Sequence, residues 1–318
     1  MDIAVVGSTN VDLVTYIDRM PVPGETLPAR DFALGCGGKG ANQAVAATRL
    51  GSEVLFVTRI GNDPFAELSL RNFLENGIET HFVSRTDTTS GVAPILVGPD
   101  GENSILIVAG ANAHLSVADI DRAAEAIARC RLLVLQLEIP LETVYRAVQL
   151  GAEAGIPVLL NPAPVPPELD LERIANVDYL VPNVGELQAL TRLRRGRPVG
   201  QDSGHEVEAS AGALLACGIA NVIVTLGGEG VLWVNDDHSV RFPARSVEPV
   251  DTTGAGDAFI GCLAHCLVHT GDVRRSIELA TAYAADSVTR RGTQTAYATA
   301  ADFRARTGFA LPWPTRSS

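Results

Sequence analysis

Residues 131–162, RLLVLQLEIPLETVYRAVQLGAEAGIPVLLNP, decide the fold, because two short apolar runs flank a helical pattern. The runs LLVL and VLL are apolar at every position, which is typical of strands buried on both faces. This order predicts a βαβ unit with parallel strands. The alternation continues to about residue 289. We therefore expect an α/β fold, a doubly wound and mainly parallel sheet with helices on both faces.

The N-terminal third interrupts this alternation. Residues 11–35 are irregular around the turn PVPG, and residues 82–108 contain two β-rich runs around the turn PDG. Turn residues between β-rich runs indicate hairpins. We expect the two segments to form a small β-sheet lid, inserted in a single α/β domain over residues 1–310. Residues 193–204 are expected to be a flexible loop of no assignable function, and residues 311–318 an irregular tail.

Composition and charge exclude several classes of function. The 318 residues include 25 Lys and Arg against 37 Asp and Glu, a formal net charge of −12 that disfavours binding to nucleic acid. No apolar run reaches the ~18 residues of a membrane-spanning helix, and the first residues do not resemble a secretory signal. The five cysteines form no C-x-x-C pair. We expect a cytoplasmic protein with reduced cysteines and no membrane or nucleic-acid partner.

A glycine-rich segment, GCGGKG over residues 35–40, matches the G-x-G-x-x-G pattern of dinucleotide sites. The match is weak, because no buried strand leads directly into it and the next strand does not end in an acidic residue. The segment also lacks the Ser or Thr that follows the lysine of a Walker A loop. Either its glycines let the backbone approach a small polar ligand beside Lys39 and Asn42, or it is a tight turn with a solvated lysine.

A second glycine motif, DTTGAGD over residues 251–257, opens a long helical pattern. Glycine-rich backbone at a helix start points N–H groups and the positive end of the helix dipole at one spot, which suits a phosphate or a phosphoryl group in transit. Asp257 lies in the first turn of that helix. It either favours the dipole as an ordinary first-turn carboxylate or accepts a proton from an attacking hydroxyl.

Polar side chains also follow two of the predicted strands. Asn10 and Asp12 come after the first strand, two positions apart and on one face, and Glu138 follows LLVLQL. Ligands bind at the carboxyl ends of strands in open α/β sheets, so these groups can hold sugar hydroxyls. The alternative for Asn10 and Asp12 is a turn in which their side chains bond to the local backbone.

The helix after Asp257 carries two cysteines and two histidines on one face, which invites a zinc hypothesis. Zinc–ligand bonds are ~2.0–2.3 Å long, whereas the outer two of these residues are about 10 Å apart along a helix. One metal ion can bind an i, i+4 pair but not all four side chains. Packing in the core is therefore the preferred interpretation for Cys262, His265, Cys266 and His269.

The motifs occur in a recognisable order across nearly the whole chain. They read GSTNVD, PVPGET, GGKGANQAVAA, TSGVA, GANAHLS, QLEIPLE, LNPAP, PNVGE, VTLGGEGV, DTTGAGDAF and VTRRGTQ. In this order the sequence resembles the ribokinase-like carbohydrate kinases, the family that includes fructokinases and adenosine kinase. Within that family, GGKGANQA together with N-x-D after the first strand is most similar to the ribokinases.

The resemblance implies transfer of the γ-phosphoryl group of ATP to the primary 5-hydroxyl of D-ribose, giving ribose 5-phosphate. It makes Asp257 the general base, and it makes the N–H groups of Gly254, Ala255 and Gly256 an anion hole for the moving phosphoryl group. The sugar hydroxyls would be bound by Asn10, Asp12, Gly38, Lys39, Asn42 and Glu138.

The resemblance also implies a nucleotide side and two cations. In PNVGE, Asn183 and Glu186 would organise Mg²⁺ and the nucleotide phosphates, largely through water. The other residues carried over for the nucleotide are Thr225, Leu226, Gly227, Gly228, Glu229, Gly230, Gly256 and Thr281. An activating K⁺ would be bound by carbonyl groups of Asp251, Thr253, Ser287, Arg290 and Gly292. Ala296 departs from the family, because a serine hydroxyl ligand is expected there.

Three functional classes stay open at this point: a ribokinase, a related kinase acting on another sugar or a nucleoside (deoxyribose, a ketose, adenosine), and a sugar-binding sensor without catalysis. Residues of the pocket decide between the first two, and fold analogy does not. The intact GAGD motif speaks against the third. The family commonly forms homodimers through the lid, whose exposed strand edges are natural pairing surfaces.

Overall fold

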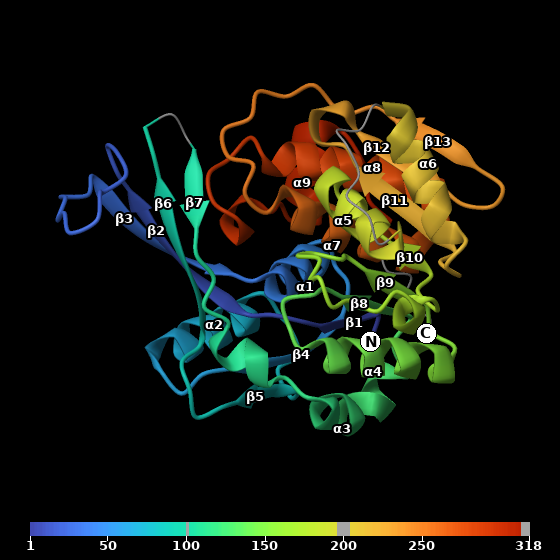
Figure 1. Ribbon diagram of the computed structural model, residues 1–318, viewed down its shortest axis with the longest axis horizontal. Helices are drawn as coiled ribbons and strands as arrows, with labels where there is room; N and C mark the ends of the chain where they lie inside the picture. Colours follow the sequence, from blue (N-terminus) through green and yellow to red (C-terminus); the bar gives the residue numbers. More distant parts are fainter. Residues whose placement is uncertain (100–101, 196–203, 313–318) are drawn as a thin grey trace.

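The computed structural model describes residues 1–99, 102–195 and 204–312, which contain a large and a small β-sheet (Figure 1). From β5 to β11 the neighbouring strands of the large sheet run parallel, and β12 and β13 extend it antiparallel. Its strands, in spatial order, are β13 (Ser239–Phe242), β12 (Val231–Val234), β11 (Asn221–Thr225), β10 (Tyr179–Leu180), β9 (Val158–Leu160), β8 (Leu132–Leu135), β1 (Ile3–Val6), β4 (Val54–Ile60) and β5 (Val83–Arg85).

The central strands form because each is apolar on both faces. In β1, Ile3 and Val5 contribute to one hydrophobic core, and Ala4 and Val6 contribute to a second core on the opposite face. Strand β8 divides its residues in the same way. Burial of a large aliphatic side chain contributes about 1.5–3 kcal/mol, so two cores on one sheet stabilise the fold strongly. The predicted doubly wound α/β architecture is confirmed.

Helices cover both faces of the large sheet. Residues of α1, α2, α7, α8 and α9 contribute to the first core, and residues of α3, α4, α5 and α6 to the second. The helices are α1 (Lys39–Arg49), α2 (Pro64–Glu75), α3 (Val117–Ile127), α4 (Leu141–Ala154), α5 (Val184–Arg195), α6 (Gly204–Leu215), α7 (Ala255–Thr270), α8 (Val273–Ser287) and α9 (Ala300–Thr307). Four short 3₁₀ turns complete the described helical elements: η1 (Gly110–His114), η2 (Glu172–Ile174), η3 (Gly227–Glu229) and η4 (Gln294–Ala296).

The small sheet projects from one side of the large one, at the left of Figure 1. Its strands, in spatial order, are β3 (Asp31–Gly37), β2 (Asn10–Tyr16), β6 (Gly91–Val97) and β7 (Asn103–Ile105). The segments predicted to form the lid supply these four strands. The boundaries differ in both segments. Strands β2 and β3 extend beyond 11–35, to Asn10 and Gly37, and β5 falls inside the predicted segment 82–108 yet pairs with β4 of the large sheet.

Two other predicted segments lie partly outside the described residues. The predicted loop 193–204 is wrong at both ends, because α5 continues to Arg195 and α6 begins at Gly204. Its residues 196–203 lie outside the described residues. Of the predicted tail, residues 313–318 are not described, nor are residues 100 and 101 of the PDG turn. Within the described residues, every helix is too short or too polar to cross a membrane.

Candidate active site

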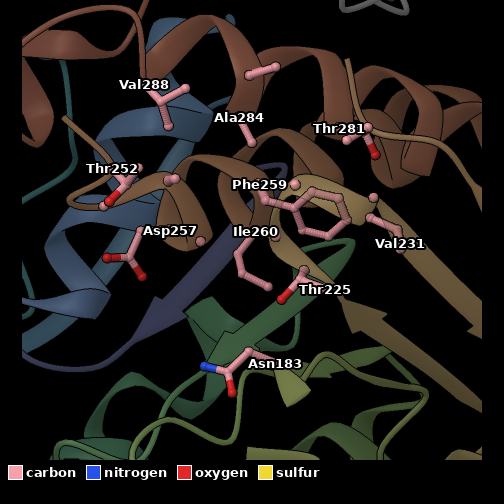
Figure 2. A pocket seen from close by; sticks show the side chains of 18 of the residues that line it. Asn183, Thr225, Val231, Thr252, Asp257, Phe259, Ile260, Thr281, Ala284 and Val288 are labelled. Atoms are coloured by element: carbon pink, nitrogen blue, oxygen red, sulfur yellow. The ribbon is translucent and has the colours of Figure 1, made fainter. Parts of the chain in front are cut away.

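A cavity of about 810 Å³ lies between the start of α7, one face of α8 and the ends of β10 and β11 (Figure 2). Asp257 and Thr252 lie at one side of it, and Val231 and Thr281 lie at the other. Twelve of the predicted site residues line it: Lys39, Asn183, Glu186, Thr225, Gly227, Gly228, Gly230, Gly254, Ala255, Gly256, Asp257 and Thr281.

The loop before α7 has the backbone that an anion site needs. Gly254 is the N-terminal cap of the helix in the left-handed region, with φ 73°, and no side chain caps the helix there. A Cβ atom at Gly254 would lie 2.3 Å from the Thr293 side chain, so glycine is required by space as well as by conformation. The Tyr297 hydroxyl donates to the Gly254 carbonyl over 2.9 Å and holds the loop in place.

Asp257 is buried in the first turn of α7, and both of its oxygens accept hydrogen bonds from α1. Asn42 Nδ2 donates to Oδ2 over 2.8 Å, and Gln43 Nε2 donates to Oδ1 over 2.9 Å. Gln43 is oriented in turn by Gln136, whose Nε2 donates to Gln43 Oε1 over 2.6 Å. The segment GGKGANQ therefore reaches the DTTGAGD motif through the two amide side chains that follow its glycines.

Strand pairing brings the two polar residues of β2 against the glycines before α1. Asn10 pairs with Gly37 in the register of β2 and β3. The Asp12 carboxylate packs on Gly37, where a Cβ atom would lie 2.3 Å from Oδ1. Burial, followed by the nearby charges of Glu138 and Asp257, raises the pKa of Asp12 to about 6. The sugar-binding residues predicted from opposite parts of the sequence thus share one electrostatic environment.

Glu138 and Lys39 connect this region to the cavity. Glu138 Oε2 accepts from Ser8 Oγ over 2.5 Å and from the Lys39 backbone N–H over 3.2 Å. Burial lowers the pKa of the Lys39 ammonium group, but the carboxylates of Asp257, Glu138 and Glu186 outweigh this effect, and the net shift is upward. A lysine that stays charged among three carboxylates is suited to binding an anionic group beside them.

Asn183 and Glu186 form a reciprocal pair at the start of α5. The Asn183 backbone N–H and Nδ2 each donate to a Glu186 oxygen over 2.8 Å, and the Glu186 N–H donates to Asn183 Oδ1 over 2.8 Å. Burial is the main cause that raises the pKa of Glu186. The pair thus has a structural role as a helix cap, and its oxygen atoms also fit a magnesium ion bound through water.

The predicted nucleotide loop forms η3 and its flanks. Thr225, Gly227, Gly228 and Gly230 line the cavity. Leu226 packs against the second core instead. Neither Leu226 nor Glu229 is among the described residues that line the cavity. Thr281 lines it from α8, but its hydroxyl donates to the Ile277 carbonyl over 2.8 Å within the helix.

The residues predicted to bind a monovalent cation lie where the loop before α7 meets the segment after α8. Asp251 links the loop to that segment, because its two carboxylate oxygens accept hydrogen bonds from the N–H groups of Thr253 and Gly292, each over 2.9 Å. Carbonyl oxygens are the ligands that suit K⁺. Ala296 adds no side-chain oxygen, and its carbonyl accepts from Arg290 Nε over 3.1 Å.

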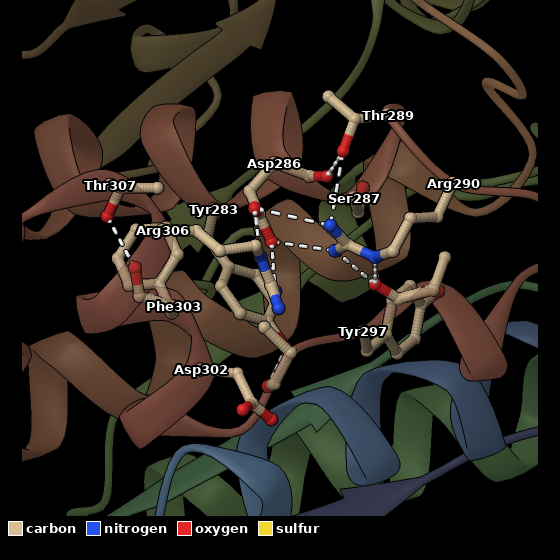
Figure 3. A network of polar contacts seen from close by, with 12 residues as sticks. Tyr283, Asp286, Ser287, Thr289, Arg290, Tyr297, Asp302, Phe303, Arg306 and Thr307 are labelled. Atoms are coloured by element: carbon tan, nitrogen blue, oxygen red, sulfur yellow. Dashed lines mark hydrogen bonds and ion pairs between the residues drawn. The ribbon is translucent and has the colours of Figure 1, made fainter.

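An ion-pair network around the buried Asp286 connects this segment to α8 and α9 (Figure 3). Asp286 Oδ2 accepts from Arg290 over 2.7 Å and from Arg306 over 2.8 Å. Burial alone raises the pKa of Asp286, but the two guanidinium groups bring it below its ordinary value. Because Arg290 also binds the Ala296 carbonyl, the network fixes the backbone just beyond the predicted cation ligands.

The cysteine and histidine cluster on α7 packs in the protein interior. Cys262 and Cys266 belong to the first core, with their sulfur atoms 4.0 Å apart. Both ring nitrogens of His265 are engaged, Nδ1 with Ser52 Oγ at 2.8 Å and Nε2 with the Pro312 carbonyl at 3.0 Å. Burial lowers the pKa of His265 to about 4, so this histidine is neutral at pH 7.

Sequence reasoning missed two kinds of site residue. The first kind lines the cavity with apolar side chains, such as Phe259 and Ile260 of α7, whose helical spacing looks like ordinary core. The second kind consists of buried amides around Asp257, namely Gln43, Gln136 and Gln294. Gln43 follows Asn42 directly in the GGKGANQ motif, which was the one local signal available for it.

Comparison with known proteins identifies the family. The pfkB family carbohydrate kinase pattern matches residues 1–300, almost the whole chain. The chain belongs to the pfkB family of carbohydrate kinases. As a pfkB-family kinase it is an ATP-dependent sugar kinase, which confirms the resemblance and the enzyme class expected from the motifs.

Individual relatives of this pfkB-family kinase agree with that placement. It is 52% identical over 298 residues to a deoxyribokinase of Salmonella typhi, covering 93% of this chain and 95% of the relative. The crystal structure of a ribokinase from Thermotoga maritima superposes with a TM-score of 0.88 at 37% identity, covering 97% and 99% of the two chains. An Arabidopsis thaliana ribokinase complexed with ribose and ATP gives a TM-score of 0.85 at 28% identity, covering 97% and 99%.

Proposed function

We propose that this kinase transfers the γ-phosphoryl group of ATP to the primary 5-hydroxyl of a pentose, with 2-deoxy-D-ribose as the preferred acceptor. The observation that carries the proposal is the position of Asp257. This residue lines the cavity at the start of α7, where backbone N–H groups suit an anion, and it accepts hydrogen bonds from side chains of α1. A phosphoryl acceptor must meet its base and its anion hole in one place, and this arrangement supports that requirement.

In the proposed reaction, Asp257 accepts the proton of the 5-hydroxyl as its oxygen attacks the γ-phosphorus. The new bond joins the sugar oxygen to phosphorus, and the bond from phosphorus to the β,γ-bridging oxygen breaks, which leaves ADP. The N–H groups of Gly254, Ala255 and Gly256 would stabilise the charge on the phosphoryl oxygens in transit. Lys39, which lines the same cavity, would add a positive charge beside them.

The cation assignments belong to the same proposal. Asn183 and Glu186 would hold Mg²⁺ through water, and the carbonyls of Asp251, Thr253, Ser287, Arg290 and Gly292 would hold K⁺. When bound, Mg²⁺ neutralises charge on the nucleotide phosphates, and K⁺ adds positive charge near the anion hole. The protein's own part is to orient the oxygen ligands, which Asp251 supports through its bonds to Thr253 and Gly292.

Two observations favour different acceptors. The 52% identity to a deoxyribokinase, against 37% to the Thermotoga ribokinase, supports 2-deoxy-D-ribose. Asn10 and Asp12 are polar groups two positions apart on one strand, and they suit the adjacent hydroxyls that D-ribose carries at C2 and C3. D-Ribose, giving ribose 5-phosphate, is therefore the second candidate. The sugar site would comprise Asn10, Asp12, Gly38, Lys39, Asn42 and Glu138.

A direct test measures kcat/KM with ATP for both pentoses, and for a ketose and adenosine, on the full chain. We expect deoxyribose to exceed ribose by at least tenfold; the reverse order would assign ribose, and phosphorylation of adenosine alone would reject a pentose kinase. In Asp257→Asn we expect kcat to fall by about 10²–10⁴ while calorimetry still detects sugar binding, because a neutral amide cannot accept the proton. Near-normal kcat in that variant would remove Asp257 from the role of base.

The proposal extends to assembly: the small sheet serves as a lid over the sugar and as the surface of a homodimer. Phe32 and Leu34 of β3 are 56% and 54% exposed, although both are large and apolar. They lie two positions apart on an edge strand and so share one face. An apolar face on an edge strand is a surface that a second copy of the chain would cover.

A further inference from the structure

Outside the cavity, a chain of four amide side chains links Arg49 to Asp257. Arg49 Nε donates to Asn76 over 2.8 Å, and Asn76 Nδ2 donates to Asn72 Oδ1 over 3.2 Å. Asn72 Nδ2 donates to Gln294 Oε1 over 2.7 Å, and Gln294 Nε2 donates to Asn42 Oδ1 over 2.9 Å. Asn42 Nδ2 then donates to Asp257 Oδ2 over 2.8 Å. We call Arg49, Asn76, Asn72, Gln294 and Asn42 the amide relay.

The two ends of the amide relay give it a direction. A guanidinium group can only donate hydrogen bonds, and an ionised carboxylate can only accept them. With Arg49 at one end and Asp257 at the other, one orientation of the four amides satisfies every bond. Reversal of a single amide would place two oxygens against each other on one of its sides and two N–H groups against each other on the other side.

The relay spans elements that local structure does not join. Arg49 and Asn42 belong to α1, Asn72 to α2, and Gln294 to η4, which follows the predicted cation segment. Asn42 and Gln294 are buried, at 5% and 4% exposure, so an unmatched amide there would lack water as a substitute partner. The orientation of the Asn42 amide is thus determined at a distance from the reacting atoms.

We propose that Gln294 and Asn72 are positioning residues, which orient Asn42 so that its N–H faces Asp257 and the substrate hydroxyl. The proposal rests on the proposed role of Asp257 as the base. Asn42 touches both Asp257 and, in the proposed function, the sugar. An inverted Asn42 would present its carbonyl to the carboxylate, repel it and remove a donor from the place where the hydroxyl binds.

The test reverses the relay with an isosteric change. In Asn72→Asp, measured at pH 8, the new carboxylate cannot donate to Gln294, so Gln294 and then Asn42 turn over. We expect kcat to fall at least tenfold and KM for the sugar to rise, while KM for ATP stays within twofold of the wild-type value. Asn72→Ala removes the donor without adding an acceptor, so we expect a kcat at least fivefold higher than that of Asn72→Asp.

Three further variants separate the effect of amide orientation from the effects of charge and of folding. Leu74→Asp adds the same charge at a 66% exposed position of α2 and should keep the wild-type kcat. Gln294→Glu imposes the same reversal at the centre of the relay and serves if Asn72→Asp does not fold. In the background of Gln294→Met, which interrupts the relay, Asn72→Asp should lower kcat by less than twofold.

Equal kcat values for Asn72→Asp and Asn72→Ala would overturn the proposal. So would a double variant, Asn72→Asp with Gln294→Met, whose fold-loss in kcat equals the product of the losses in the two single variants. Failure of the proposed function looks different. A wild-type chain that phosphorylates no pentose contradicts the proposed function, which names a pentose as the acceptor. A wild-type chain that does so, with an unchanged kcat in folded Asn72→Asp, contradicts only the relay.

Discussion

Asp12, one of the proposed sugar ligands, has a perturbed pKa that gives the proposed sugar site a testable pH dependence. Its pKa of about 6 lies above its ordinary value because of burial and two neighbouring carboxylates. The group is therefore ionised above pH 6 and becomes protonated as the pH falls through 6. An ionised carboxylate accepts two or more hydroxyl hydrogen bonds, and bonds to a charged group contribute about 1.5–3 kcal/mol each.

We accordingly predict that the Kd for the pentose, measured by calorimetry without nucleotide, rises by about tenfold from pH 7 to pH 5. Asp12→Asn removes the ionisable group. The Kd of this variant for the pentose should be higher than that of the wild-type chain at pH 7 and nearly constant from pH 7 to pH 5. A wild-type Kd that does not change between pH 5 and pH 7 would show that Asp12 does not titrate against the sugar.

Site residues that lie in a short local motif could be predicted from the sequence, whereas those whose role depends on a distant partner could not. Asp257, Lys39 and Glu186 lie in short conspicuous motifs, and the structure brings all three to one cavity. Gln294 ends the motif VTRRGTQ, but the motif does not show its role, because its partner Asn42 is 252 positions away. Only the packing of η4 against α1 makes that pair visible.

At the scale of elements, the segment after α8 depends on how α8 and α9 hold it. Asp286 is 5% exposed and pairs with Arg290 and Arg306, and Arg290 continues to the Ala296 carbonyl. Removal of one partner from a buried ion pair costs about 3–5 kcal/mol, because the remaining charge is left uncompensated. Two partly exposed arginines reduce that cost, so we expect a value near the lower end.

The prediction is that K⁺ raises kcat over Na⁺ at equal ionic strength, and that Asp286→Ala raises the K⁺ concentration for half-activation several-fold. The same variant should lower the free energy of unfolding by about 3 kcal/mol in denaturant titration. Arg306→Met is the matched control, since it keeps the Asp286–Arg290 pair and should alter K⁺ activation much less. Identical rates of the wild-type chain in K⁺ and Na⁺ would discard the cation site.

Elements also show why some boundaries escaped prediction. The unit β8–α4–β9 could be predicted because both of its strands are apolar throughout and its helix is long. Strand β5 has only three residues, Val-Ser-Arg, and no apolar run. Its place beside β4 is decided by pairing with Thr58–Ile60 rather than by its own sequence, so it was grouped with the lid.

For the whole molecule, the exposed apolar residues of the small sheet are the feature that a monomer does not explain. Phe32 and Leu34 of β3 are joined by Leu106 and Ile107 just beyond β7, which are 68% and 55% exposed. These strands are the two edges of the small sheet. Association through such a sheet would bury apolar surface and satisfy edge N–H and C=O groups together.

We predict a homodimer at micromolar concentration in analytical ultracentrifugation. In Leu34→Glu we expect the Kd for dissociation of the dimer to be at least tenfold higher. A charge buried at an interface without a partner costs several kcal/mol, which is enough for that change. Leu74→Glu places the same charge on an exposed leucine of α2, outside the small sheet, and should leave the dimer intact. If both variants sediment like the wild-type chain, the dimer forms elsewhere. If the wild-type chain is a monomer, the small sheet acts only as a lid.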